Sequence, residues 1–162
     1  MAVMRESLKL RSQRDMNQIF SVNATDPEMQ QAIQEARDRF SEFLKVADAD
    51  IERIIPCLDD VLIKIYLSNP DSPDSGEHVW VRYLGRDERD KTRFRGELIS
   101  SPNKVKILKK GQVANFKLER VSDWLYVEDD KAHGAFTVQL LRRRMTPKER
   151  KKHDAGYPFK FD

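Results

Sequence analysis

The sequence predicts an α+β fold, in which one long N-terminal helix packs on a curved antiparallel sheet of about five to six strands and a short helix follows at the C-terminus. Three observations predict it: an apolar stripe of helical period over residues 25–46, short alternating segments between residues 61 and 141, and a second helix start signal at Thr146. A partly open barrel is the alternative form of the same sheet. A chain of 162 residues is about one domain in size.

The long helix is predicted to begin at a capping motif. The Thr25 side chain can accept from the free N–H groups of the first turn, while Glu28 reaches back as in a capping box. Pro27 falls in the first turn, where its missing N–H costs nothing. Apolar residues then recur at intervals of three and four, at Met29, Ala32, Ile33, Ala36, Phe40, Phe43 and Leu44. This stripe predicts a helix that packs on the protein's own sheet, with a groove-filling contact to a partner as the alternative.

Six segments have the composition or the alternation of strands. Residues 61–67 are nearly all apolar and rich in β-branched side chains, which predicts a buried strand. The segment 69–76 holds two prolines and a glycine and predicts an exposed loop. Alternation with period two predicts further strands at 77–84, 94–99, 112–121, 123–127 and 135–141.

The C-terminal part of the chain is basic and carries its own helix signal. Thr146, Pro147 and Glu149 repeat the capping pattern and predict a short basic helix that ends near His153. Three aromatic residues beyond it can attach the tail to the body of the protein. The predicted organisation is a flexible or loosely ordered segment over 1–24, one α+β domain over 25–150, and a C-terminal tail over 151–162.

The net charge of +3 is unevenly distributed. Residues 1–24 hold four basic and two acidic side chains, and residues 142–162 hold eight basic and three acidic ones, so the middle of the chain carries −4. Because nucleic-acid affinity comes mostly from a basic surface, the acidic middle argues against a dedicated nucleic-acid groove in the β region. Non-specific contact with nucleic acid through residues 142–152 stays open as an alternative.

Cysteine usage and hydropathy indicate a cytoplasmic protein. The single cysteine, Cys57, cannot build an internal disulfide framework, and its apolar neighbourhood predicts a buried structural thiol. No apolar run approaches the roughly 20 residues that span a bilayer, so no membrane insertion is expected. Residues 1–16 lack the apolar core and the cleavage site of a signal peptide.

One predicted strand carries an arrangement suited to binding. His78, Trp80 and Arg82 alternate on one face of the strand, where an open surface would offer an imidazole, an aromatic floor and a charged donor. The alternative places Trp80 in the core and the other two side chains at the strand margins.

A second arrangement centres on Asp123, which precedes Trp124 and Tyr126. A carboxylate against an indole can have a raised pKa and act as a general acid, but Asp123 can equally organise the turn that enters its strand by accepting backbone N–H bonds. No catalytic motif, metal-ligand spacing or phosphate-binding glycine loop accompanies it, so no metal and no cofactor are expected. The candidate binding residues are therefore His78, Trp80, Arg82, Asp123, Trp124 and Tyr126.

Several motifs resemble one bacterial family. The segments Gly76–Val81, Gly96–Leu98, Lys110–Val113, Val121–Tyr126, Gly134–Val138 and Arg144–Arg150 are similar to the YegJ-like family, catalogued as domain of unknown function 2314. The resemblance covers roughly residues 25–150, and the combination of His-Val-Trp-Val with Ser-Asp-Trp-Leu-Tyr is its most specific part. It implies a bacterial α+β domain with tryptophans at defined strand positions. It implies no activity, and the link 47–58 looks longer than in the family.

These observations favour a non-enzymatic binding or interaction module, of an accessory or immunity-like kind, whose partner is another protein or an unidentified small ligand. Two alternatives belong to other classes. A small hydrolase or proton-transfer enzyme would use His78 and Asp123 and would need their side chains to converge in a pocket. A non-specific nucleic-acid binder would use the basic tails and would lose affinity steeply with salt.

Overall fold

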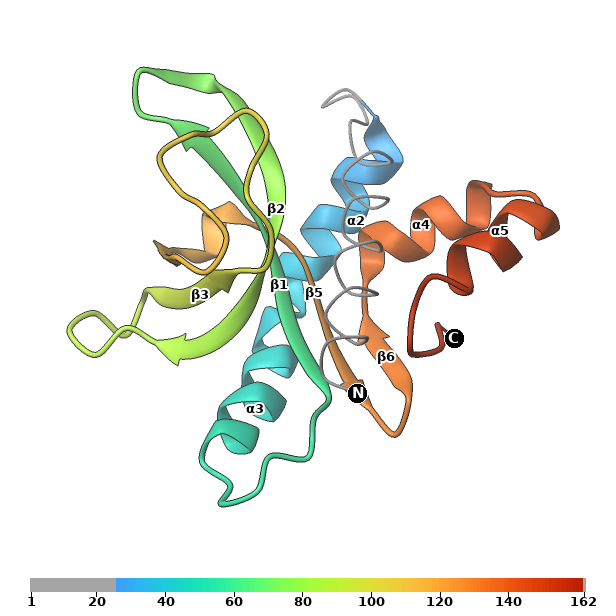
Figure 1. Cartoon of the computed structure of the whole chain (residues 1–162), viewed down its shortest axis with the longest axis horizontal. Helices are drawn as coiled ribbons and strands as arrows, with labels where there is room; N and C mark the ends of the chain where they lie inside the picture. Colours follow the sequence, from blue (N-terminus) through green and yellow to red (C-terminus); the bar gives the residue numbers. More distant parts are fainter. Residues whose placement is uncertain (1–25, 162) are drawn as a thin grey trace.

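An antiparallel sheet of six strands organises the part of the chain that the structure, a computed structural model, describes, which is residues 26–161 (Figure 1). The predicted loosely ordered segment 1–24 lies outside these residues. The strands, with spatial order β4-β3-β2-β1-β5-β6, are β1 (Asp60–Asn69), β2 (Ser72–Arg86), β3 (Phe94–Leu98), β4 (Val113–Phe116), β5 (Val121–Glu128) and β6 (Lys131–Gly134). The helices of the same residues are α2 (Pro27–Asp38), α3 (Phe40–Ile51), α4 (Phe136–Arg144) and α5 (Pro147–Asp154), with a 3-10 turn η1 (Leu118–Arg120).

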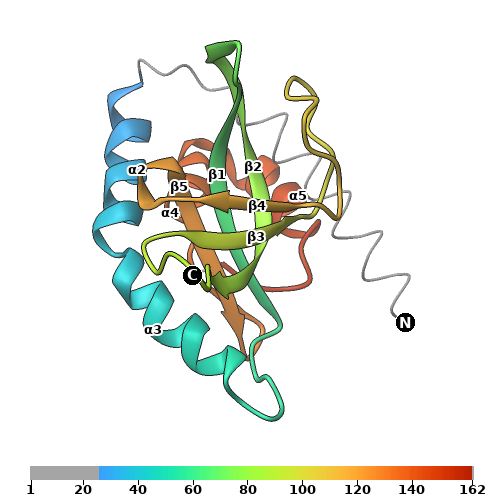
Figure 2. The same ribbon diagram turned by 90° about the vertical axis from the view of Figure 1, so that its left-hand side faces the viewer.

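The prediction of one long N-terminal helix is wrong. The apolar stripe is continuous, but the helix is interrupted at Arg39, whose backbone (φ −99°, ψ 8°) separates α2 from α3. The sheet is strongly twisted, and β3 and β4 cross in front of β1 and β2 (Figure 2). A straight helix could not follow that surface, so α2 lies against β5 and α4 while α3 lies against β2 and β5. The N-cap residue of α2 differs from the prediction as well. It is Asp26 and not Thr25, and the Asp26 side chain accepts hydrogen bonds from the backbone N–H groups of Glu28 and Met29.

Both faces of the central strands are covered, each by a different layer. We call the side under α2 and α3 the helix face; its buried side chains include Phe43, Ile63, Val81 and Trp124. The opposite side, under α4 and the C-terminal residues 157–161, is the tail face; its buried cluster is Leu62, Trp80, Leu125, Val127, Ala132, Ala135, Val138 and Phe159. Alternation along β1 places Ile63 and Ile65 on the helix face and Leu62 and Lys64 on the tail face.

The predicted strand at 135–141 is a helix. Gly134 and Ala135 both adopt left-handed backbone conformations (φ +84° and +56°), which end β6 and turn the chain into α4. In α4 the buried residues Thr137, Val138, Leu140 and Leu141 follow helical spacing. The apolar residues of this segment satisfy both periods, so the alternation alone could not separate strand from helix.

The sheet is open, and the partly open barrel does not form, because β4 and β6 are separate edges of the sheet. The predicted loop at 69–76 is likewise mostly strand, since β1 continues to Asn69, β2 starts at Ser72, and Ser68 pairs with Gly76. The helix start signal at Thr146 is confirmed: α5 begins with a complete capping box between Thr146 and Glu149.

Candidate functional site

The structure divides the predicted binding residues between the two faces of the sheet. Trp124 lies on the helix face, is 2% exposed and donates its indole N–H to the carbonyl of Ala36 at 2.8 Å. Tyr126 lies beside it, with parallel rings 6.2 Å apart. Trp80 is 0% exposed and belongs to the tail face. The two tryptophans therefore belong to two cores and do not form one surface.

The remaining predicted residues fall on the side of Trp80 but have different surroundings. Arg82 is exposed and pairs with Glu97 of the neighbouring strand at 3.4 Å. Asp123 is 0% exposed, whereas His78 is half-buried. His78 and Asp123 are thus on one face of the sheet, but each hydrogen-bonds to other groups.

Lys64 is the centre of this polar cluster, and the sequence reading missed it. It lies in a strand that reads as apolar, yet its side chain is buried, and its Nζ donates to Thr137 Oγ1 at 2.6 Å. Its Nζ also lies 5.6 Å from the centre of the Trp80 ring. Burial lowers the pKa of Lys64 to about 8, against the opposing effect of the Asp123 charge. The sequence does hold a signal for it, namely a single lysine inside a run of Val, Leu and Ile. A lysine is rarely buried unless it has a partner, so its place in an apolar strand indicates a polar contact.

Asp123 connects the sheet to α4. Its carboxylate accepts the backbone N–H groups of Trp124, Phe136 and Thr137 at 2.8–2.9 Å, and it also accepts the Thr137 hydroxyl. Two of those N–H groups are the free donors at the start of α4, whose own N-cap residue makes no side-chain cap. Burial raises the pKa of Asp123, while Lys64 and these hydrogen bonds act in the opposite direction. The residue therefore caps a helix from a neighbouring strand.

His78 bonds to the same network through Ser122. Its Nδ1 lies 2.9 Å from Ser122 Oγ, and that hydroxyl donates to the carbonyl of Lys64 at 3.2 Å. Because the hydroxyl proton is directed to the carbonyl, His78 Nδ1 acts as the donor to Ser122. Burial, followed by the charges of Lys64 and Arg37, lowers the pKa of His78 to about 4, so the imidazole is neutral at pH 7.

The contacts of Asp123, Lys64 and His78 hold α4 and the strands together, and they do not form a general acid–base pair. The Ser122 side chain is buried, and the Asp123 carboxylate is fully occupied by α4, so no hydrogen bond joins Asp123 to His78 among the described residues. A general acid–base pair needs its members within hydrogen-bond reach of each other or of a shared substrate. Within residues 26–161, no group of three His, Cys, Asp or Glu side chains is arranged to hold a metal ion.

The most exposed apolar side chains lie elsewhere, in the link between α3 and β1. Ile54 is 101% exposed and Ile55 is 78% exposed. The loop is held by Asp50, a buried carboxylate that accepts the backbone N–H groups of Cys57 and Leu58 at 2.8 and 3.3 Å. The expectation of a buried structural thiol is wrong, because Cys57 is exposed and accepts a hydrogen bond from Arg53 at 3.1 Å.

The charge of the basic segment 142–152 is partly neutralised by ion pairs at the end of α4. Arg142 makes a two-pronged pair with Asp154 at 2.9 and 2.8 Å, and Arg144 pairs with Asp26 and Glu28 at the start of α2. These pairs reduce the charge available to phosphates, and contact with nucleic acid through 142–152 stays a prediction.

A family model described as "Uncharacterized protein conserved in bacteria (DUF2314)" matches residues 26–161. This confirms the family indicated by the motifs, and the YegJ-like label stays a prediction. A protein of Neisseria meningitidis serogroup B is 27% identical to this chain over 144 residues, and its name provisionally assigns it to the ankyrin repeat proteins. The matched residues are 88% of this chain and 56% of that protein. The chain thus spans little more than half the length of that relative. No solved structure matches the chain.

Proposed function

The chain belongs to this family of conserved bacterial proteins, and we propose that it is a non-enzymatic protein-interaction module that works in the cytoplasm. The observation that carries the proposal is the presentation of Ile54 and Ile55 on a loop that is held in place by hydrogen bonds to the buried Asp50 carboxylate. An unpaired, exposed cysteine in the same loop suits a reducing compartment. Among the described residues, no helix combines the length and the apolar composition needed to span a bilayer.

The loop is suited to docking because it is both apolar and fixed. Burying an isoleucine side chain that is exposed in the free protein contributes about 1.5–3 kcal/mol. Ile51, at the end of α3, is half exposed and extends the apolar surface toward the sheet. Since Asp50 already orders the backbone of the loop, a partner would not need to supply that ordering free energy.

The charges around the loop favour a protein partner over an anionic membrane. Glu52, Asp59 and Asp60 flank the isoleucines, and Arg53 is the single cation in the same link. An acidic rim repels phospholipid head groups and complements a protein surface in which basic residues surround an apolar pocket. The Neisseria relative supports the same class of function, because repeat proteins of the kind its name indicates bind partners on extended surfaces.

A photo-crosslinking experiment tests the proposal. A photoreactive amino acid is placed at position 54 of the full chain in bacterial cells, and at position 148 on exposed α5 as the matched control. We expect a discrete crosslinked protein species from position 54 and none from position 148. The double substitution Ile54→Ser and Ile55→Ser, with the photoreactive residue moved to position 51, should remove the species while Tm stays unchanged, since both side chains are exposed. Crosslinks of equal pattern from both positions would contradict the proposal.

A further inference from the structure

We propose that the open edge of β4 binds an extended acidic segment of a partner protein by strand addition. This surface is distinct from the Ile54–Ile55 loop, and either proposal can fail without the other. It rests on three features of the same edge: backbone groups that point outward, cationic side chains around them, and a pocket beside the end of the strand.

The register of the sheet shows which backbone groups of β4 are available. Leu98 of β3 donates to the carbonyl of Gln112, and Ala114 and Phe116 follow opposite Gly96 and Phe94. Because alternate residues of an antiparallel strand bond to the same neighbour, the even-numbered residues of β4 face β3. The N–H and C=O groups of Val113 and Asn115 therefore point away from the sheet, where no strand of residues 26–161 pairs with them. This is the geometry that strand addition uses.

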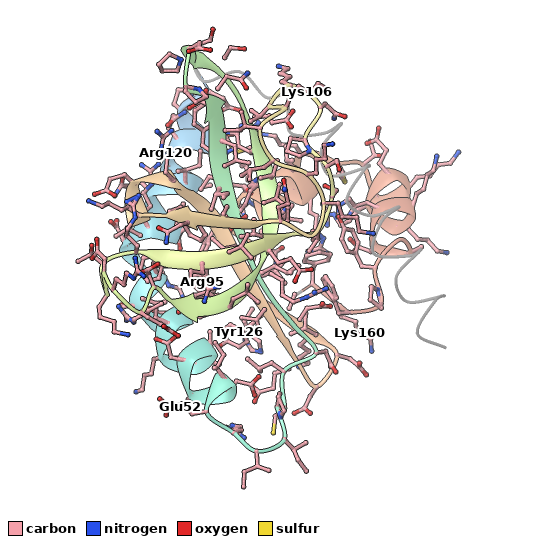
Figure 3. The ribbon with its side chains drawn as sticks, turned by 60° about the vertical axis from the view of Figure 1, so that its left-hand side comes forward. Glu52, Arg95, Lys106, Arg120, Tyr126 and Lys160 are labelled. Atoms are coloured by element: carbon pink, nitrogen blue, oxygen red, sulfur yellow. The ribbon has the colours of Figure 1, made fainter. Side chains whose placement is uncertain are left out.

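Cationic side chains surround this edge. Arg93 lies at the entry to β3 and holds the Asn115 side chain at 2.7 Å. Lys117 follows β4 and Arg120 lies in η1. Two carboxylates offset part of this charge: Asp90, whose pKa is lowered in part by the charges of Lys117 and Arg93, and Asp87, which accepts a hydrogen bond from the Asn115 side chain at 2.7 Å. Arg95 and Arg120 lie on the β4 side of the molecule, whereas Lys160 lies on the opposite side (Figure 3). These charges stand out because the middle of the chain is acidic overall.

A pocket of about 450 Å³ completes the surface. Its lining combines the cations Arg93, Lys117 and Arg120 with the apolar side chains Leu67 and Phe116, and Glu119 is the one acidic member. Val113 and Leu118, at the two ends of the edge, are 43% and 39% exposed. A peptide that pairs with β4 can place one apolar side chain in the pocket and its carboxylates against the cations.

The same charges exclude a second copy of the chain as the preferred occupant. Antiparallel pairing of two β4 edges through Val113 and Asn115 would place Lys117 near Lys109 and Lys110 of the other copy, and like charges across a strand pair are destabilising. A short edge strand flanked by lysine or arginine is also a common protection against unspecific pairing. The edge is thus selective, since its cations repel a basic strand, give a neutral strand no charge partner and attract an acidic one.

Fluorescence polarisation with a defined probe tests the proposal. The probe is a labelled peptide of about eight residues that alternates Asp or Glu with Ser around one central Val, a length that matches the strand-addition mode. We expect saturable binding to the full chain that weakens as salt rises. A peptide with lysine in place of the acidic residues should not bind. Neither should the acidic peptide methylated at alternate backbone nitrogens, because it keeps its charge but loses the ladder donors.

Variants of the protein separate strand pairing from charge attraction. Val113→Pro removes one outward N–H and leaves the bonds to β3 intact, so affinity should fall by about tenfold or more, while Val113→Thr should bind like the wild type. Lys117→Glu with Arg120→Glu, which needs no change to the backbone, should abolish binding. Ile54→Ser should have no effect. Equal binding of the methylated peptide would overturn the proposal, as would self-association through β4 in analytical ultracentrifugation.

Discussion

The two edges of the sheet differ in whether a further segment of the chain pairs with them. At the β6 edge, Ala132 donates to the carbonyl of Lys160 and Lys160 donates to that of Asp130, so the C-terminal tail continues the ladder. Phe159 packs on the tail face beside it, together with the partly buried rings of Tyr157 and Phe161. At the β4 edge no described segment adds to the ladder. One edge is closed by the chain itself and the other is left available.

The charged groups differ in the same way between the covered tail face and the open β4 edge, which we call the closed side and the open side. On the closed side, Lys64, Asp123 and His78 are buried or half-buried and satisfied by α4 and β5. On the open side, Lys117 and Arg120 are exposed. Buried charges cost several kcal/mol unless they are paired, so the first group must serve the fold. The residues with the most distinctive chemistry in the sequence hold the structure together, whereas the cations beside β4 are exposed on the surface.

The largest expected effect is that of Asp123→Ala on the closed side. The substitution removes the acceptor of four hydrogen bonds and leaves Lys64 buried without its compensating charge. We expect the free energy of unfolding to fall by about 3–5 kcal/mol. Urea denaturation measures it, with ligand binding at β4 as a second readout.

Glu97→Ala is the matched control from the open side. It removes an exposed partner of Arg82 and should cost less than about 1 kcal/mol. Asp123→Asn keeps the shape of the side chain and part of its hydrogen-bond accepting capacity. Its loss in the free energy of unfolding should therefore lie between those of Asp123→Ala and Glu97→Ala. If Asp123→Ala and Glu97→Ala proved equally mild, the closed side would not be the more tightly assembled one.

The next effect is that of uncovering the β6 edge. Phe159→Ala should destabilise the protein by about 3 kcal/mol, at the low end for a buried aromatic ring because the C-terminal tail can adjust. The amide protons of Ala132 and Lys160 should then exchange faster, whereas those of Gly96 and Leu98 should not. Hydrogen exchange measured by NMR distinguishes these sets. Phe161→Ala, at a less buried ring, is the control with a smaller expected effect.

Local signals in the sequence predicted the elements that depend on local interactions. The strand at 61–67 and the helix start at Thr146 were found, because an apolar run and a capping box are sufficient evidence for each. The kink at Arg39 was not predictable, since it follows from the twist of the sheet beneath the helix. The segment 135–141 was assigned to a strand because its helix depends on a carboxylate at Asp123, twelve residues earlier than its first residue.

The sequence could indicate which face of the sheet some candidate residues share, but not how deeply each is buried. His78, Trp80 and Asp123 do lie on one face, as period-two alternation can indicate, but burial depends on α4 and the tail, whose positions no local pattern gives. Trp124 lies on the other face because it is adjacent to Asp123 in β5, and neighbouring residues of a strand point to opposite faces of the sheet. Lys64 was overlooked because a pattern of apolar residues tolerates one exception. Ile54 and Ile55 lie in the link 47–58, to which the sequence analysis assigned no site.

The smallest expected effect concerns the response of the closed side to acid. The pKa of His78 is about 4 in the folded protein and 6.5 in its ordinary environment. Between those values the unfolded chain binds a proton that the folded protein does not, so stability is fully present above pH 6.5 and decreases as pH falls toward 4. Each pKa unit corresponds to about 1.4 kcal/mol, and from pH 7 to pH 5 we expect a loss on the order of 2 kcal/mol.

The groups facing His78 determine how this loss can be assigned. They are Ser122 on β5, the Tyr66 ring on β1 at 5.2 Å, and the charges of Lys64 and Arg37. Asp and Glu side chains of ordinary pKa change little above pH 5. Asp123, whose pKa is raised, and Lys64, whose pKa is lowered, lie in the same network, so the comparison between the wild type and a His78 variant is needed to assign the loss to the imidazole. His78→Gln keeps a polar contact with Ser122 and should flatten the dependence measured by urea denaturation at several pH values. An unchanged slope in this variant would show that the loss does not arise at His78, and the closed side would then be no more acid-sensitive than the open one.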